Sequence, residues 1–146
     1  MKDSVITFLL QAKRATYAGK GPESPSSRPC SHDYEYARDG FKYIDSYFGG
    51  KKFAGEEVLS EDNRPFWAMN YIGRVLADGF SGDFLKSALL KCSQELPFRG
   101  PESYCDGNLT YKNRVNGCFA WFYGYEEIYN GDIKVYECDY HGGLIE

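Results

Sequence analysis

Arginine and aromatic side chains are the residues of this sequence whose types and positions predict chemistry. Arg28, Arg74 and Arg99 lie in or beside irregular segments, where a guanidinium can bind a phosphate or carboxylate through paired hydrogen bonds. Trp67 and Trp121 lie in strand-like runs and offer flat apolar surfaces for a planar base. This combination predicts a site for a nucleotide-like ligand. Arginines that pack on structural carboxylates explain the same pattern equally well.

A histidine, a tyrosine and an amide on neighbouring strands complete the predicted ligand-binding set. Its members are Arg28, His32, Tyr47, Trp67, Asn70, Arg74, Arg99 and Trp121. The glycine-rich segments near these residues are too short for a P-loop or a dinucleotide fingerprint, and they lack the strand-turn-helix spacing of either motif.

Histidine and cysteine form no recognisable catalytic or metal-binding motif. His32 and His141 are far apart in the sequence, no GxSxG elbow is present, and the five cysteines include no CxxC pair. We therefore predict no catalytic residues, no metal and no cofactor.

Two pairs of adjacent glutamates are the best candidates for acid–base chemistry. Glu56-Glu57 and Glu126-Glu127 each place one carboxylate on either face of a strand, so one member of each pair faces the concave side. Burial there raises a carboxyl pKa, as a glycosidase-like mechanism requires. The alternative, which we favour, is that the inward glutamates bond to tyrosine hydroxyls or arginines and hold the sheet together.

Composition excludes several classes of partner. The net charge is −4 and the pI is near 5.3, and the arginines are scattered, so duplex nucleic acid is not an expected partner. The odd cysteine count indicates reduced thiols and a cytoplasmic location. The apolar run at residues 5–10 is too short for a signal peptide or a membrane span.

The pattern of apolar residues predicts two helices and about seven strands. Val5, Phe8, Leu9 and Ala12 recur at helical spacing after a cap at Ser4, and a second helix follows a cap at Ser81. The strand predictions are His32–Arg38, Phe41–Phe48, Lys52–Leu59, a central strand within Asn63–Leu76, Leu109–Val115, Cys118–Ile128 and Ile133–Tyr140.

These elements predict a single α+β domain over residues 1–146. Its sheet is a curved antiparallel sheet or half-barrel with the helices on one side. Predicted turns lie at Asp39-Gly40, Asn116-Gly117 and Asn130-Gly131. Aromatic residues make up 17% of the chain, which favours sheet and predicts a homodimer or higher homo-oligomer.

Several segments resemble an uncharacterised bacterial family, a domain of unknown function. The resemblance covers nearly the whole chain and is carried by SSRPCSHDYEY (26–36), DSYFGGKKFAGEE (45–57), WAMNYIGRV (67–75), FSGDFLKSAL (80–89), RGPESYCDG (99–107) and YECDYHGG (136–143). Members of that family occur alone or behind helix-turn-helix modules of XRE-type regulators, which implies a sensor for a small molecule. Before His32 there is room for only one helix, so regulation of DNA by this chain is not expected.

The sequence therefore predicts a non-enzymatic small-molecule binding module. The expected ligand is an anionic, nucleotide-derived metabolite or signal, which the protein senses or sequesters. The alternatives are a hydrolase that uses inward carboxylates and a protein-interaction module without membrane contact.

Overall fold

The computed structural model describes residues 2–146 and contains two helices and eight strands. The elements are α1 (Lys2–Ala15), β1 (His32–Arg38), β2 (Phe41–Gly49), β3 (Lys52–Glu61), β4 (Arg64–Val75), α2 (Gly82–Leu89), β5 (Ser103–Asp106), β6 (Leu109–Cys118), β7 (Trp121–Asn130) and β8 (Ile133–Leu144). The strands form one antiparallel sheet in the order β1-β2-β3-β4-β8-β7-β6-β5. The sheet has two free edges, so it is not closed into a barrel. The predicted α+β class and the central position of β4 are confirmed.

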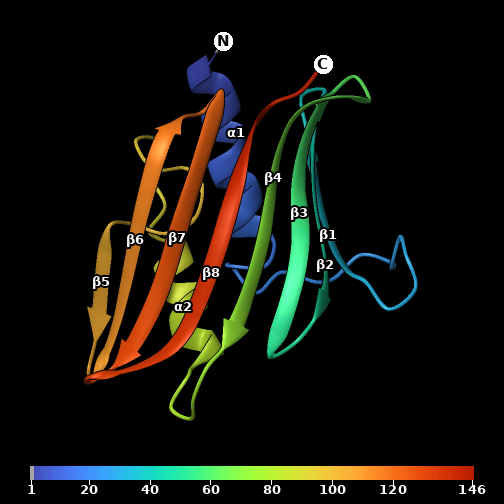
Figure 1. Ribbon diagram of the computed structural model, residues 1–146. Helices are drawn as coiled ribbons and strands as arrows, with labels where there is room; N and C mark the ends of the chain where they lie inside the picture. The colour runs from blue at the N-terminus through green and yellow to red at the C-terminus, as the bar shows by residue number, and fades with distance from the viewer. Residues whose placement is uncertain (1) are drawn as a thin grey trace.

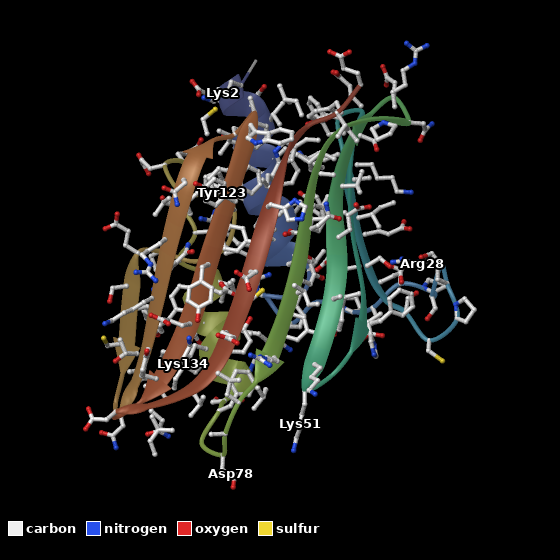
Figure 2. The ribbon with its side chains drawn as sticks, viewed as in Figure 1. Lys2, Arg28, Lys51, Asp78, Tyr123 and Lys134 are labelled. Atoms are coloured by element: carbon white, nitrogen blue, oxygen red, sulfur yellow. The ribbon has the colours of Figure 1, made fainter. Side chains whose placement is uncertain are left out.

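Both helices lie on the same face of the sheet (Figure 1). We call this helix-covered side the inner face and the opposite side the outer face. Tyr123 on β7 lies on the outer face, where 60% of its surface is exposed (Figure 2). The molecule thus has two layers, and the main core lies between the inner face and the helices.

The first four strands follow the sequence prediction because their turns have a distinct chemistry. Asp39 and Gly40 both have positive φ, 52° and 84°, as a two-residue hairpin turn requires. Asp62 and Asn63 also have positive φ, at 48° and 65°, and turn β3 into β4. At α2, the Ser81 hydroxyl accepts a hydrogen bond from the Phe84 amide at 3.1 Å, so the predicted N-cap is confirmed. In contrast, α1 begins at Lys2, which places Ser4 inside the helix instead of at its cap.

The structure corrects two features of the second half. A short edge strand, β5, is added to the predicted seven, and it pairs with the first residues of β6. The β6–β7 turn lies at residues 119–120 instead of Asn116-Gly117, which remain within β6. Burial explains this shift. The Phe119 ring stacks on Trp67 with centroids 5.1 Å apart, and the Phe119 carbonyl accepts a hydrogen bond from Trp67 Nε1 at 3.0 Å.

All five cysteines are free thiols, with Cys92 and Cys138 buried and the other three exposed. No helix within residues 2–146 is long and apolar enough to cross a membrane.

Gly124 allows a tyrosine of β8 to cross β7 on the inner face. Tyr140 lies opposite Gly124, and its hydroxyl donates a 2.6 Å hydrogen bond to Asn113 Oδ1 on β6. A methyl group at position 124 would overlap the buried Tyr140 ring. We expect Gly124→Ala to destabilise the fold by about 1–3 kcal/mol, measured by urea unfolding.

Gly82→Ala is the matched control because a Cβ there meets no atom within 4 Å. This change at the start of α2 should be neutral or stabilising by about 0.5 kcal/mol. Equal losses in the two variants would contradict the crossing of β7 by Tyr140.

Candidate functional site

A cavity of about 170 Å³ lies between the inner face of the sheet and the helical layer. Its wall includes side chains from β2, β3, β4, β8 and α2 and from the segments that follow the two helices. The lining residues are Tyr17, Asp45, Tyr47, Gly49, Gly50, Phe53, Tyr71, Val75, Phe80, Leu85, Arg99 and Tyr136. A smaller hollow of about 30 Å³ shares Tyr17, Asp45 and Arg99 with it. Asp45 and Arg99 are therefore the charged groups where the two spaces meet.

Asp45 is placed in the cavity by the alternation of β2. Tyr43, Asp45 and Tyr47 share the inner face because successive strand residues point to opposite sides. The Tyr71 hydroxyl donates to Asp45 Oδ1 at 2.6 Å. To reach it, the Tyr71 ring of β4 crosses β3 at Gly55, where a Cβ would overlap both Tyr71 and Tyr47.

Burial and a neighbouring carboxylate raise the pKa of Asp45. Only 6% of its surface is exposed, and Glu57 lies directly opposite it on β3. Burial and, second, the charge of Glu57 raise the pKa of Asp45 to about 7, although Tyr71, Lys13 and Arg99 act in the opposite direction. Asp45 therefore changes protonation state near neutral pH.

Glu57 is held by a lysine from α1. Lys13 Nζ donates to both carboxylate oxygens of Glu57, at 2.8 and 3.0 Å, and the Tyr43 hydroxyl donates to Oε1. The same ammonium donates to the Phe98 carbonyl at 2.7 Å. One buried cation thus joins α1, β3 and the segment that carries Arg99.

Glu126 is fully buried and is held by Arg99 and two tyrosines. Arg99 Nη2 and Nε donate to Glu126 Oε1 at 2.5 and 3.1 Å. The Tyr136 hydroxyl donates to Oε1 at 2.8 Å, and the Tyr111 hydroxyl donates to Oε2 at 2.5 Å. The negative charge of Glu126 therefore compensates the positive charge of the buried Arg99.

Gly100 fixes the backbone that carries Arg99. Its amide donates to the Tyr111 hydroxyl at 2.9 Å, and its carbonyl accepts from Asn113 Nδ2 at 2.8 Å. The irregular segment between α2 and β5 is therefore bound to β6 next to the cavity.

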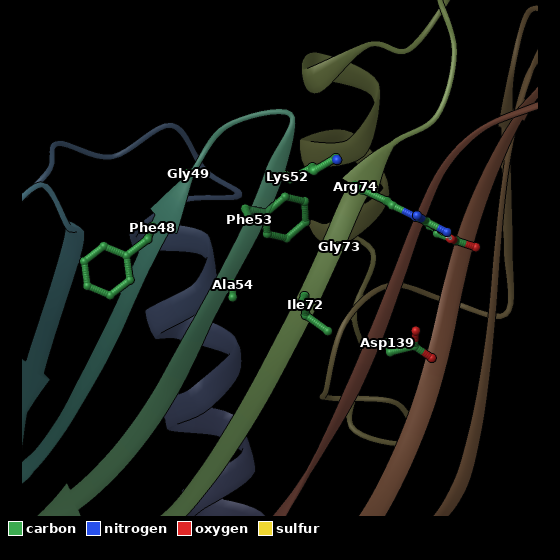
Figure 3. A pocket seen from close by; sticks show the side chains of 10 residues that line it. Phe48, Gly49, Lys52, Phe53, Ala54, Ile72, Gly73, Arg74 and Asp139 are labelled. Atoms are coloured by element: carbon green, nitrogen blue, oxygen red, sulfur yellow. Dashed lines mark hydrogen bonds and ion pairs between the residues drawn. The ribbon is translucent and has the colours of Figure 1, made fainter.

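A second, more open groove of about 570 Å³ lies on the outer face (Figure 3). Phe48, Ile72, Arg74 and Asp139 contribute side chains to it, and Ile72 is 62% exposed. Arg74 contacts Glu137 there, with Nε and Nη2 each 2.8 Å from Oε1. Because its apolar floor faces water, this groove is a weaker candidate than the inner cavity.

The structure divides the predicted ligand-binding residues between several locations. Tyr47 and Arg99 both line the inner cavity. His32 does not line this cavity but stacks on Tyr47 with ring centroids 4.9 Å apart, and its Nδ1 is 2.9 Å from Glu23 Oε1.

The other predicted residues lie away from the cavity. Arg28 donates to the Ser46 hydroxyl at 2.7 Å and covers the Phe48 ring. Asn70, Arg74 and Trp121 belong to strand positions that alternate with inner-face residues, and Trp121 is 76% exposed. Trp67 is fully buried in the core. These five residues do not converge on one ligand.

Sequence reasoning did not include Asp45, Tyr71 and Phe80, which line the cavity, in the predicted site. The signal for Asp45 was present, because an acidic residue alternates with Tyr43 and Tyr47 on one strand face. No comparable signal marks Phe80, which lies in a connecting segment. Its position depends on the stacking of its ring on Tyr136, with centroids 5.2 Å apart.

No metal centre is formed by the part of the chain that the structure describes. Residues 2–146 contain no group of three or more histidine, cysteine, aspartate or glutamate side chains positioned to hold a metal ion. The inner cavity instead offers a carboxylate, tyrosine hydroxyls and aromatic rings, which suit an organic ligand.

One family model matches more than half of the chain. Residues 45–145 match the family described as a domain of unknown function, DUF5680, and the chain belongs to this family. The match is narrower than the resemblance predicted from the sequence, and Lys13 and Tyr17 lie outside it. No curated protein and no solved structure matches the chain.

The two arginine–glutamate pairs predict a large and a small loss of stability, respectively, when the arginine is replaced. Arg99→Met leaves the buried Glu126 without its cation and should cost about 3–5 kcal/mol in urea unfolding. Arg74→Met removes a pair whose arginine side chain is 56% exposed and should cost less than about 1 kcal/mol.

A double variant separates the loss of charge pairing from the loss of packing. Arg99→Met with Glu126→Leu should recover much of the lost stability, because no unpaired buried charge remains. A double variant as unstable as Arg99→Met alone would contradict this explanation.

The raised pKa of Asp45 predicts a contribution to the stability of the ligand-free protein that is lost as the pH rises from about 4 to 7. Across this range the unfolded chain releases a proton that native Asp45 retains, so ionisation favours unfolding. Asp45→Asn should lack this component. The difference between the two unfolding free energies should change by up to about 4 kcal/mol between pH 4 and pH 8. Parallel pH profiles for the two proteins would contradict the raised pKa.

Proposed function

We propose that this chain is a non-enzymatic binding module for a small molecule, which lies in the inner cavity. The supporting observation is Asp45, a carboxylate that is 6% exposed, lines the cavity and has a single hydrogen-bond donor among the described residues. A buried carboxylate without full pairing is costly, and such groups concentrate at functional sites.

Aromatic rings around Asp45 support a planar ligand. Phe53 and Phe80 stack on Tyr136 with interplanar angles of 14° and 15°. These flat apolar surfaces suit a ring such as the base of a nucleotide-derived compound. The cavity volume of about 170 Å³ is below the roughly 300–1,000 Å³ of pockets for larger ligands, so it holds one small ring system.

An anionic ligand, as predicted from the sequence, needs guanidinium groups that are free to bind it. Arg99 is already paired with Glu126, and Arg74 with Glu137. Arg28 donates to Ser46. A phosphate group would have to displace these partners. The binding of a small molecule therefore has more support than the negative charge predicted for that molecule.

A sensing or sequestering role fits such a module. The resemblance to a bacterial family that also occurs behind XRE-type regulators supports the binding of a small signal. Sequestration needs only a dissociation constant well below the concentration of the ligand and enough copies of the protein.

Acid–base catalysis is the second candidate function. Burial raises the pKa of Asp45 to about 7, which is the range that a general acid or base needs at neutral pH. Under this alternative the ligand is altered when bound. Glu57 and Glu126 are less suited to the task because cations and tyrosine hydroxyls already hold them.

Self-association through the outer face remains a prediction. Trp121 and Tyr123 point to this face from β7 and are 76% and 60% exposed, and interfaces are enriched in these residue types. A two-fold dimer would cover them and leave the inner cavity within each subunit.

Incubation with a pool of cell metabolites tests the proposed function. After removal of unbound compounds and denaturation of the protein, mass spectrometry should recover a small compound in unchanged form. Val75→Phe fills the cavity from β4 and should reduce the captured amount at least about tenfold.

Ile72→Phe is the control on the outer face of the same strand and should not affect capture. Recovery of a chemically altered compound would support the acid–base alternative. Capture that is lost in Ile72→Phe and retained in Val75→Phe would place the ligand in the outer groove.

A further inference from the structure

Asp45 presents one oxygen atom to the inner cavity. The Tyr71 hydroxyl donates to Oδ1 at 2.6 Å, and no donor within residues 2–146 bonds to Oδ2. A carboxylate has about four acceptor sites, and buried carboxylates usually fill most of them. In the described residues, every side-chain polar atom that is sealed from solvent has a hydrogen-bond partner. Because Oδ2 has none, it is not sealed, and a ligand in the cavity can contact it.

The other charged groups around Asp45 already form ion pairs with one another. Lys13 from α1 pairs with Glu57 from β3, and Arg99 pairs with Glu126 from β7. Within residues 2–146, Asp45 is the remaining buried carboxylate of the inner face, and it forms no ion pair. A ligand with a positive charge would therefore supply the missing partner, whereas an anionic ligand would add repulsion.

Tyrosine hydroxyls complete the surroundings of Asp45 and do not supply a charge. They come from the segment after α1 and from β2 and β4, and the residues are Tyr17, Tyr43, Tyr47 and Tyr71. Burial, the largest cause in each case, raises their pKa values, so they stay neutral at physiological pH. They can orient a ligand by hydrogen bonds while the carboxylate determines the preferred charge.

The shape of the cavity limits the ligand to one small ring. The cavity volume of about 170 Å³ is below the roughly 300–1,000 Å³ of pockets for drug-sized ligands. Phe53, Tyr136 and Phe80 line the cavity with near-parallel rings, and Tyr17 meets Tyr47 edge-on with centroids 6.0 Å apart. Gly49 and Gly50 at the end of β2 are exposed and also line the cavity.

We propose that the inner cavity binds a small planar compound with a cationic, amidine-like nitrogen group. The nitrogen donates a charge-assisted hydrogen bond to Asp45 Oδ2, and the ring packs against Phe53 and Tyr136. This inference rests on the proposed function, because it names the chemical class of the ligand for the same cavity.

Three ring compounds of nearly equal shape and different charge test the inference. They are benzamidine, benzamide and benzoate, which are cationic, neutral and anionic, and their binding is measured by calorimetry at pH 8. Benzamidine should bind at least about tenfold more tightly than benzamide, and benzoate should bind most weakly. Benzamidine affinity should fall about tenfold between pH 8 and pH 6, because Asp45 gains a proton across this range.

Two substitutions assign the effect to Asp45. Asp45→Asn should remove the preference for benzamidine over benzamide and its pH dependence. Asp139→Asn, which alters an exposed carboxylate of the outer groove, should change neither. A loss of benzamidine binding in Asp139→Asn alone would overturn the inference by placing the cation outside the inner cavity.

Other outcomes separate the ligand class from the proposed function. Tighter binding of benzoate than of benzamidine would overturn the ligand class and leave the cavity as a binding site. If no probe binds, the inference is also overturned. The proposed function fails separately, if the wild type captures no metabolite or if Val75→Phe leaves metabolite capture unchanged.

Discussion

The burial of three carboxylates on the inner face of one sheet determines how the helical layer is built. Asp45, Glu57 and Glu126 are each at least 94% buried, since their exposed fractions are 6%, 2% and 0%. Removing charges from water costs several kcal/mol for each ion unless partners compensate. Lys13 brings α1 to Glu57, and Arg99 brings the segment before β5 to Glu126. The helical layer is therefore positioned by charge as well as by apolar packing.

Much of the fold was predictable because local patterns and tertiary packing agree in the first half of the chain. Turn residues with positive φ determine the register of β1 to β4, and alternation assigns their faces. The missed strand, β5, is four residues long and lies beside β6 without an alternating apolar pattern of its own. The β6–β7 turn was misplaced because the burial of Phe119 against Trp67 outweighs the local turn preference of Asn116-Gly117.

The candidate site was less predictable than the fold. Residue type marked Tyr47 and Arg99 as candidates, and the structure places both in the wall of the cavity. Residue type does not tell which face of a strand the helices cover, so Arg74 was grouped with Arg99 although they lie on opposite faces. The binding of Arg99 to Glu126 depends on Gly100, which attaches an irregular segment to β6 through Tyr111 and Asn113. Such long-range contacts leave no periodic signal in a sequence.

Asp45 differs from the other two inward carboxylates in a way that stability alone does not explain. Glu57 and Glu126 each have a cation and at least one tyrosine hydroxyl, so their burial is compensated. Asp45 has one hydroxyl and lies opposite the negative charge of Glu57, which makes its ionised form costly. An asparagine would keep the hydrogen bond from Tyr71 without this cost. The carboxylate therefore lowers the stability of the ligand-free protein at neutral pH, and a bound cationic ligand would restore it. Proteins accept such local costs mainly where a ligand or a reaction uses them.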